Sequence, residues 1–148
     1  MSETAARENL EKFLGQAAKA GRVRVIALDP LAGGAIQDNR LLLAEIEGGA
    51  FAGKLDAVLR MDAPSRLAAS HDRAAEFAIL QCAHRAGVKA PEPLWLCTDS
   101  AVLGRPFFVM RRIEGEAFGH RLVKDAAERG FGERLAAELG EELAKIHA

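Results

Sequence analysis

The chain has 148 residues, of which 49% are apolar and 28% are charged, and its formal net charge is −1. This length fits one domain, or one complete lobe and the start of another, and the apolar fraction is high enough to form a core rather than a disordered chain. A net charge so close to zero gives no general attraction to nucleic acid or to an acidic membrane. No apolar run approaches the roughly 20 residues of a membrane span, so neither nucleic acid nor a membrane is an expected partner.

The cysteines and the N-terminal residues indicate a cytoplasmic protein. The N-terminus is polar and has no apolar signal core. Cys82 and Cys97 have no partners at zinc-binding spacing, and we interpret both as free thiols in a reducing compartment. No metal site is expected, because the four histidines also lack metal-ligand spacing and are interpreted as structural or exposed: His71, His84, His120 and His147.

The first half of the chain predicts one helix and then three strands. Residues 3–20 carry apolar side chains on one helical face, with Ser2 as a plausible cap and Gly21 as a stop. The following segments are rich in β-branched and other apolar residues and are separated by breaks that contain glycine or proline. They predict strands over residues 23–28, 36–47 and 55–61, the last as the hairpin partner of the second.

The second half predicts a helix, two strands and another helix. Residues 66–86 are rich in alanine, and Gly87 is a good C-terminal stop. The apolar stripe of this helix is predicted to consist of Ala75, Phe77, Ile79, Leu80 and Ala83. The remaining elements are strands at 94–97 and 107–113, a long turn at 98–106 between them, and a helix at 133–147.

This order of elements predicts an α+β fold with a mostly antiparallel sheet of about five strands. A doubly wound parallel sheet would need a helix after nearly every strand, and three consecutive strands do not provide that.

The strand at 55–61 presents two different faces. Successive side chains point to opposite sides, so the apolar Leu55, Ala57, Leu59 and Met61 share one face. Asp56, Val58 and Arg60 share the other, which suits a flat heterocycle against Val58 and phosphates near Arg60. The alternative is an edge strand with a solvated arginine, and the strand alone favours that alternative.

Two further features sharpen the first interpretation. Glu76 follows Arg60 by 16 positions, in the predicted helix, where a glutamate is usually solvated. A strand cation paired with a helix carboxylate is, however, how protein kinases hold the α- and β-phosphates of ATP. Gly33 and Gly34, between the first two strands, would let the backbone approach phosphate oxygens, although a double glycine is more often a simple turn.

Four segments together resemble the aminoglycoside phosphotransferase/choline kinase-like family. They are Ala57-Val-Leu-Arg60, Glu76 within Arg-Ala-Ala-Glu-Phe-Ala-Ile-Leu, Pro91-Glu-Pro-Leu-Trp-Leu-Cys97, and Gly104-Arg-Pro-Phe-Phe-Val-Met-Arg-Arg-Ile-Glu-Gly115. The resemblance runs from about Leu31 to Ala148. It implies a protein-kinase-like fold with a five-stranded N-terminal lobe, a hinge and a larger helical C-terminal lobe. It also implies transfer of the γ-phosphoryl group of ATP, or in some members GTP, to a small-molecule hydroxyl with Mg²⁺.

The resemblance assigns roles to individual residues. Arg60 stands where the family places its phosphate-binding cation, often a lysine, and its planar fork is not equivalent to an ammonium group. Glu76 matches the helix acid. The remaining matches are Gly33 and Gly34 for the loop over the phosphates, Met110 for the back of the adenine pocket, and Arg111 to Ile113 for the hinge whose backbone would bind the adenine edge. The alternative for Met110, and for Phe107 and Phe108, is ordinary core.

The family's catalytic segment is absent from these residues. The resemblance implies an H-G-D-x-x-x-x-N-like segment that orients the acceptor hydroxyl and, with a later aspartate, holds Mg²⁺. The 148 residues contain no His-Gly-Asp, and His147 lies on the helix that leads into that loop in the family. We therefore expect a truncated N-terminal ATP-binding portion that has no catalytic or metal-binding residues and is inactive alone.

The predicted organisation is an N-terminal helix at 1–22, a nucleotide-binding lobe at 23–115, and the start of a helical C-terminal lobe at 116–148. The alternative function is a stand-alone, non-catalytic nucleotide-binding or regulatory module that forms a homodimer through its exposed lobe face. A third alternative is an α+β domain with no nucleotide role. The acceptor is not identified, because the family's acceptor contacts come chiefly from the C-terminal lobe.

Overall fold

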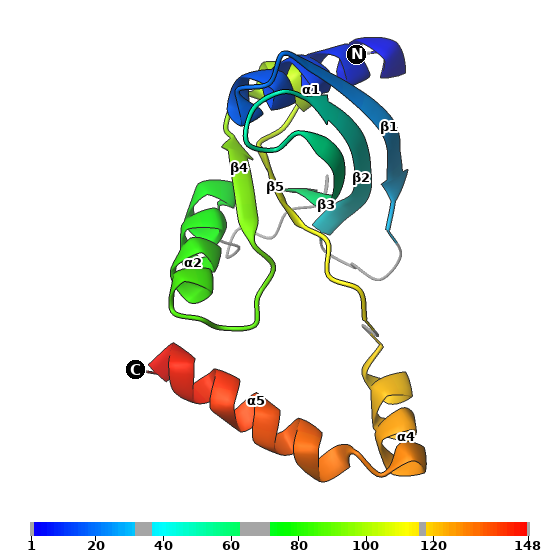
Figure 1. The fold of residues 1–148 in the computed structure, drawn as a ribbon, viewed down its shortest axis with the longest axis vertical. Helices are drawn as coiled ribbons and strands as arrows, with labels where there is room; N and C mark the ends of the chain where they lie inside the picture. Colours follow the sequence, from blue (N-terminus) through cyan, green and yellow to red (C-terminus); the bar gives the residue numbers. More distant parts are fainter. Residues whose placement is uncertain (1, 32–36, 63–71, 116–117, 148) are drawn as a thin grey trace.

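The computed structural model describes residues 2–31, 37–62, 72–115 and 118–147. Its elements, in chain order, alternate between helices and groups of strands (Figure 1). They are α1 (Glu3–Ala18), β1 (Arg22–Pro30), β2 (Gln37–Glu47), β3 (Gly53–Asp62), α2 (Arg73–Arg85), β4 (Pro93–Cys97), α3 (Ser100–Leu103), β5 (Phe107–Arg111), α4 (Gly119–Arg129) and α5 (Gly132–His147).

The five strands form one antiparallel sheet in the order β1-β2-β3-β5-β4. Strands β1, β2 and β3 pair in chain order, and the predicted pairing of the second and third strands is confirmed. The fifth strand lies between β3 and β4, so β3 is a central strand with β2 on one side and β5 on the other. This arrangement confirms the predicted α+β fold and excludes the edge position for the strand that carries Arg60.

One face of the sheet packs against α1 and forms the main core. The predicted alternation on β3 is confirmed, because Leu55, Ala57, Leu59 and Met61 are all buried. They pack with Leu10, Leu14, Phe107 and Val109, among others. The predicted cap is also present, since the Ser2 hydroxyl accepts a hydrogen bond from the Ala5 amide at 3.3 Å. The helix ends before the predicted stop at Gly21, because Lys19 already adopts a left-handed conformation.

The opposite face of the sheet packs against α2. The helix begins after Asp72, whose carboxylate accepts a hydrogen bond from the Ala75 amide at 2.7 Å. Phe77 packs on Phe108 of β5, with ring centroids 5.7 Å apart. The predicted apolar stripe is wrong in part: of its five residues only Phe77 is buried, and Ile79 is 56% exposed. The other fully buried side chain of this helix is Arg73, because the face toward the sheet is partly ionic.

The second half contains two helices that the periodicity did not predict. The predicted long turn at 98–106 includes the short helix α3, capped by the Asp99 carboxylate. Helix α4 precedes the predicted α5, and both stand apart from the sheet (Figure 1). The end of α5 approaches the loop after α2, where the Lys145 ammonium donates to the Gly87 carbonyl at 3.0 Å.

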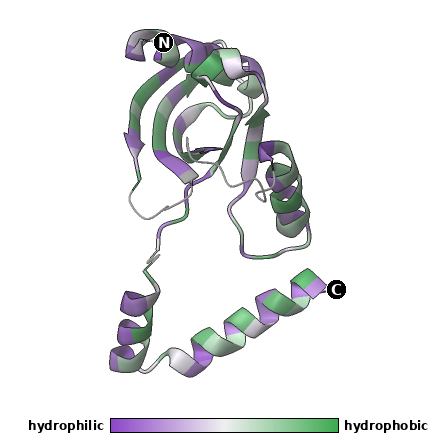
Figure 2. Ribbon diagram, turned by 180° about the vertical axis from the view of Figure 1, so that it is seen from behind, coloured by the Kyte–Doolittle hydropathy of each residue, from purple (hydrophilic) through white to green (hydrophobic). Residues whose placement is uncertain are grey.

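Apolar side chains of α5 face solvent. Leu139, Leu143 and Ile146 are 62%, 52% and 61% exposed. Figure 2 shows hydrophobic residues recurring along this helix. Among the helices of the described ranges, none has both the length and the apolar character needed to cross a membrane.

Candidate functional site

The two charged residues singled out by the sequence meet in the structure. Arg60 is close to the end of β3, on the face opposite the main core, and Glu76 is in the first turn of α2. The Arg60 Nη2 atom lies 2.7 Å from the Glu76 Oε1 atom, and about three quarters of each side chain is buried. A solvated arginine and a solvated helix glutamate are therefore excluded for this pair.

A second arginine, which the sequence reasoning missed, binds the other carboxylate oxygen. The Arg73 Nη2 atom lies 2.8 Å from Glu76 Oε2, and the Arg73 Nε atom lies 2.9 Å from Asp62 Oδ1. Only 3% of the Arg73 side chain is exposed. Asp62, Arg73, Glu76 and Arg60 thus form a charge cluster of alternating sign, with two acids and two cations. The available signal was weak: Arg73 precedes Glu76 by three positions, one helical turn, and Asp62 shares the strand face of Arg60.

The electrostatic setting of Arg60 is that of a cation partly removed from water. Its pKa is lowered, first by burial and then by the neighbouring positive charge of Arg73, while the charge of Glu76 opposes this shift. An arginine stays protonated in such a setting. The Arg60 Nε atom, like the Nε and Nη1 atoms of Arg73, is buried and has no hydrogen-bond partner within the described part of the chain. Such a donor is costly unless a ligand, water or further group satisfies it.

An apolar shelf lies beside this charge cluster on the same face of the sheet. It consists of Leu41, Leu43, Val58 and Met110, which are all partly exposed. Leu41 is directly opposite Val58 in the β2–β3 pair, and Met110 is opposite Val58 in the β3–β5 pair. Val58 and Met110 were predicted from the sequence, whereas the two leucines were not, because their contribution depends on the register of β2 against β3.

The end of β5 and the segment after it use some of their backbone groups within the lobe. The Arg111 amide donates to the Glu92 carbonyl at 2.9 Å, and the Arg112 amide donates to the Asp56 carbonyl at 3.3 Å. The Arg111 and Arg112 side chains form exposed ion pairs with the same two partners. Ile113 is 60% exposed. Within the segment whose backbone is predicted to bind the adenine edge, the amides of Arg111 and Arg112 are thus engaged elsewhere, and that of Ile113 has no partner within the described ranges.

Other predicted residues are not part of this arrangement. Gly33 and Gly34 lie outside the described residues. His84, His120 and His147 are exposed, and His71 lies outside the described residues. Among the residues that the structure describes, no group of three histidine, cysteine or acidic side chains is placed to hold a metal ion.

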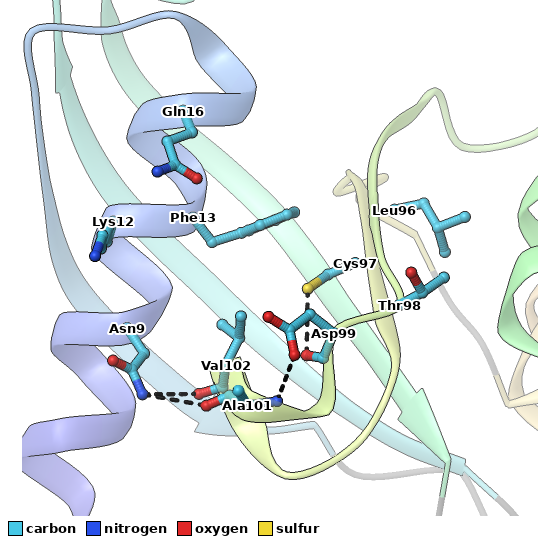
Figure 3. Close-up of a pocket in the computed structure, with 10 residues that line it drawn as sticks. All are labelled: Asn9, Lys12, Phe13, Gln16, Leu96, Cys97, Thr98, Asp99, Ala101 and Val102. Atoms are coloured by element: carbon cyan, nitrogen blue, oxygen red, sulfur yellow. Dashed lines mark hydrogen bonds between the residues drawn. The ribbon is translucent and has the colours of Figure 1, made fainter.

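A separate pocket of about 560 Å³ lies on the α1 side of the sheet (Figure 3). Its polar groups mainly stabilise the turn that contains α3. The Asn9 side-chain amide donates to the Ala101 carbonyl at 3.3 Å, and the Asp99 carboxylate accepts from the Ala101 amide at 2.8 Å. Cys97 is buried at its wall, and burial raises the pKa of this thiol. This pocket is on the face of the sheet opposite Arg60 and adds nothing to the charge cluster.

Comparison with known proteins supports the interpretation from the sequence. The model of the phosphotransferase enzyme family matches residues 27–148. Acyl-CoA dehydrogenase family member 11 from Gallus gallus is 37% identical over 76 residues, which are 49% of this chain and 9% of that protein. The protein of the same name from Pongo abelii is 30% identical over 94 residues, which are 62% of this chain and 12% of that protein. The chain therefore spans about a tenth of the length of these relatives.

Proposed function

The chain belongs to the phosphotransferase enzyme family, and on that premise we propose that its sheet lobe, residues 23–115, binds the nucleotide donor. The single observation that carries this proposal is the Arg60–Glu76 ion pair at 2.7 Å beside the apolar shelf. A flat apolar surface next to a fixed cation matches the two parts of a nucleotide, a base and a polyphosphate. The chemical fit is supported by the buried Arg60 Nε donor, which has no partner within the described ranges.

The proposed roles follow from position. The adenine ring rests on Val58 with Leu41 and Leu43, and Met110 lines the back of this surface. The backbone after β5 contacts the edge of the ring, through the Ile113 amide and the Arg111 carbonyl. Arg60 donates to phosphate oxygens, and Glu76 holds the guanidinium in that orientation. Gly33 and Gly34 are proposed to cover the phosphates. ATP, or GTP, would supply the phosphoryl group, and Mg²⁺ would accompany it.

The other parts of the chain have different proposed roles. Helix α1 covers the far face of the sheet, and the segment at 116–148 is proposed to begin the helical lobe. Transfer to a small-molecule hydroxyl would need a base and metal ligands, and these 148 residues contain no His-Gly-Asp segment to supply them. We therefore expect residues 1–148 to bind nucleotide weakly and to show no turnover alone.

The test is a titration of residues 1–148 followed by two-dimensional NMR, which measures weak binding. ADP, with and without Mg²⁺, should shift resonances of the apolar shelf and should bind more tightly than adenosine. Equal affinity for ADP and adenosine, or no binding of either, would contradict the proposal. An assay of ATP hydrolysis on the same protein should show no Mg²⁺-dependent turnover above background.

A second candidate function is a non-catalytic nucleotide-binding module that self-associates. The exposed apolar residues of α5, Leu139, Leu143 and Ile146, favour it because such a stripe is usually covered by another surface. Sedimentation velocity should then show a concentration-dependent dimer that Leu143→Glu disrupts. A monomer at all concentrations would count against this candidate.

A further inference from the structure

Arg73 is the most deeply buried charged residue among those that the structure describes, and the nucleotide-binding proposal gives it no role. It occupies the first position of α2 and is 3% exposed. A buried guanidinium is costly unless it is paired, so its position is informative. Its two pairings connect different elements: Asp62 is the last residue of β3, and Glu76 is on α2.

We propose that Arg73 is a positioning residue that fixes the Glu76 carboxylate so that Glu76 can hold Arg60 toward a phosphate. This inference rests on the proposed nucleotide site and adds a residue that acts through another residue.

The two guanidiniums contact different oxygens of the Glu76 carboxylate. Arg60 takes Oε1 at 2.7 Å, and Arg73 takes Oε2 at 2.8 Å. A carboxylate held by one cation can rotate about its terminal side-chain bond, whereas two cations on opposite oxygens define its plane. The Arg73 guanidinium is in turn held at 2.9 Å from Asp62, two positions beyond Arg60 on the same strand face. Asp62 of β3 therefore orients Arg73, Arg73 orients Glu76 of α2, and Glu76 orients Arg60 of β3.

The arrangement also affects the charge that Arg60 presents. Glu76 pairs with two guanidiniums, so its single negative charge does not fully neutralise Arg60. Asp62 balances the charge of Arg73 from the other side, so the cluster is neutral as a whole. Both arginines keep buried donors without a hydrogen-bond partner in the described part of the chain, Nε of Arg60 and Nε and Nη1 of Arg73. A cation that is fixed but incompletely neutralised is suited to bind a phosphate oxygen.

The test compares affinity for ADP with affinity for adenosine in variants of residues 1–148. Arg73→Met keeps an unbranched apolar side chain and removes the guanidinium. Its affinity for ADP should fall roughly tenfold, the change expected when one charge-assisted hydrogen bond is lost, while its affinity for adenosine should change less than about twofold. Arg85→Gln, an exposed arginine in the last turn of the same helix, is the matched control and should leave both affinities unchanged.

Two further variants keep the test decisive. Arg73→Lys retains the charge but has one ammonium in place of the fork, and it decides the question if Arg73→Met does not fold. It should lose ADP affinity selectively but by less than the roughly tenfold expected of Arg73→Met. In a Glu76→Ala background, Arg73→Met should have no further effect on the ratio of the two affinities, because its action passes through Glu76.

The outcomes separate the two proposals. If the wild-type protein does not prefer ADP to adenosine, the proposed function itself fails. If the wild-type protein does, but the folded Arg73 variants lose both affinities in parallel, Arg73 is merely structural and the inference is overturned. The inference is also overturned if the ratio of ADP affinity to adenosine affinity is unchanged in folded Arg73→Met, or in Arg73→Lys where Arg73→Met does not fold. It is overturned as well if Arg73→Met causes a further selective loss of ADP affinity in the Glu76→Ala background.

Discussion

Replacing Arg60 by methionine is the most direct perturbation of the proposed nucleotide site. The side chain is about one quarter exposed, two positions from Val58 on the same strand face and directly opposite Phe108 of β5, so an unbranched apolar residue fits its surroundings. An exposed ion pair contributes up to ~1 kcal/mol, and breaking a fully buried one costs about 3–5 kcal/mol. Because Glu76 keeps Arg73 as a second partner, we expect a loss of only about 1–2 kcal/mol in the free energy of unfolding.

The effect on binding should be larger and selective. Loss of one hydrogen bond to a charged phosphate is worth about 1.5–3 kcal/mol, which corresponds to a roughly tenfold to hundredfold weaker affinity for ADP. Adenosine has no phosphate, so its affinity should be unchanged. The ADP affinity of Arg60→Lys should fall between those of the wild-type protein and Arg60→Met, because lysine keeps the charge and loses the planar fork.

The measurement combines NMR titration with both ligands and urea unfolding followed by circular dichroism. The control is Arg134→Gln, at an exposed ion pair on α5. If Arg60→Met is folded and binds ADP as tightly as the wild-type protein, Arg60 does not contact the phosphates and the proposed site is wrong.

Four further predictions concern stability and thiol reactivity. Leu59→Ala removes a fully buried side chain and should lower the free energy of unfolding by about 2–5 kcal/mol in urea. Asp72→Ala removes the acceptor of the Ala75 amide and should lower the free energy of unfolding by ~1 kcal/mol in the same measurement. Asp72→Asn keeps a side-chain acceptor and should retain most of the wild-type stability. Native protein should react with a thiol reagent at the exposed Cys82 and not at the buried Cys97, because the thiolate is the reacting form and burial raises the pKa of Cys97; peptide mass spectrometry shows which thiol is modified. The same raised pKa predicts a stabilising contribution that is present at neutral pH and lost as the pH rises through the folded-state pKa of Cys97.

The features that depend on short stretches of sequence were predictable. The alternation of side chains along β3 predicts that Leu59 is buried and that Val58 and Arg60 lie on the other face, and this prediction needs no information about the neighbouring strands. The cap at Ser2 and the helix that follows it are equally local. The pairing of Arg60 with Glu76 could be predicted because a strand cation and a helix acid together resemble the phosphate-holding pair of protein kinases.

The features that depend on distant pairing were not predictable from the residues alone. The apolar shelf requires β3 to lie between β2 and β5, although β4 precedes β5 in the chain. Arg73 was missed because an arginine in a helix is usually solvated, and only the placement of α2 against the end of β3 buries it. For the same reason the predicted apolar stripe was wrong at Ile79, which is apolar but 56% exposed.

The position of α2 therefore decides whether the proposed site exists, because α2 carries Glu76 and β3 carries Arg60. Two contacts of different physical kinds fix this position. The Phe77–Phe108 contact is apolar and insensitive to salt, with the ring centroids 5.7 Å apart. The Arg73 pairings are ionic, but a side chain that is 3% exposed is screened far less than a surface pair. The arrangement of Arg60 and Glu76 should therefore persist at salt concentrations that weaken surface ion pairs such as Arg24–Glu45.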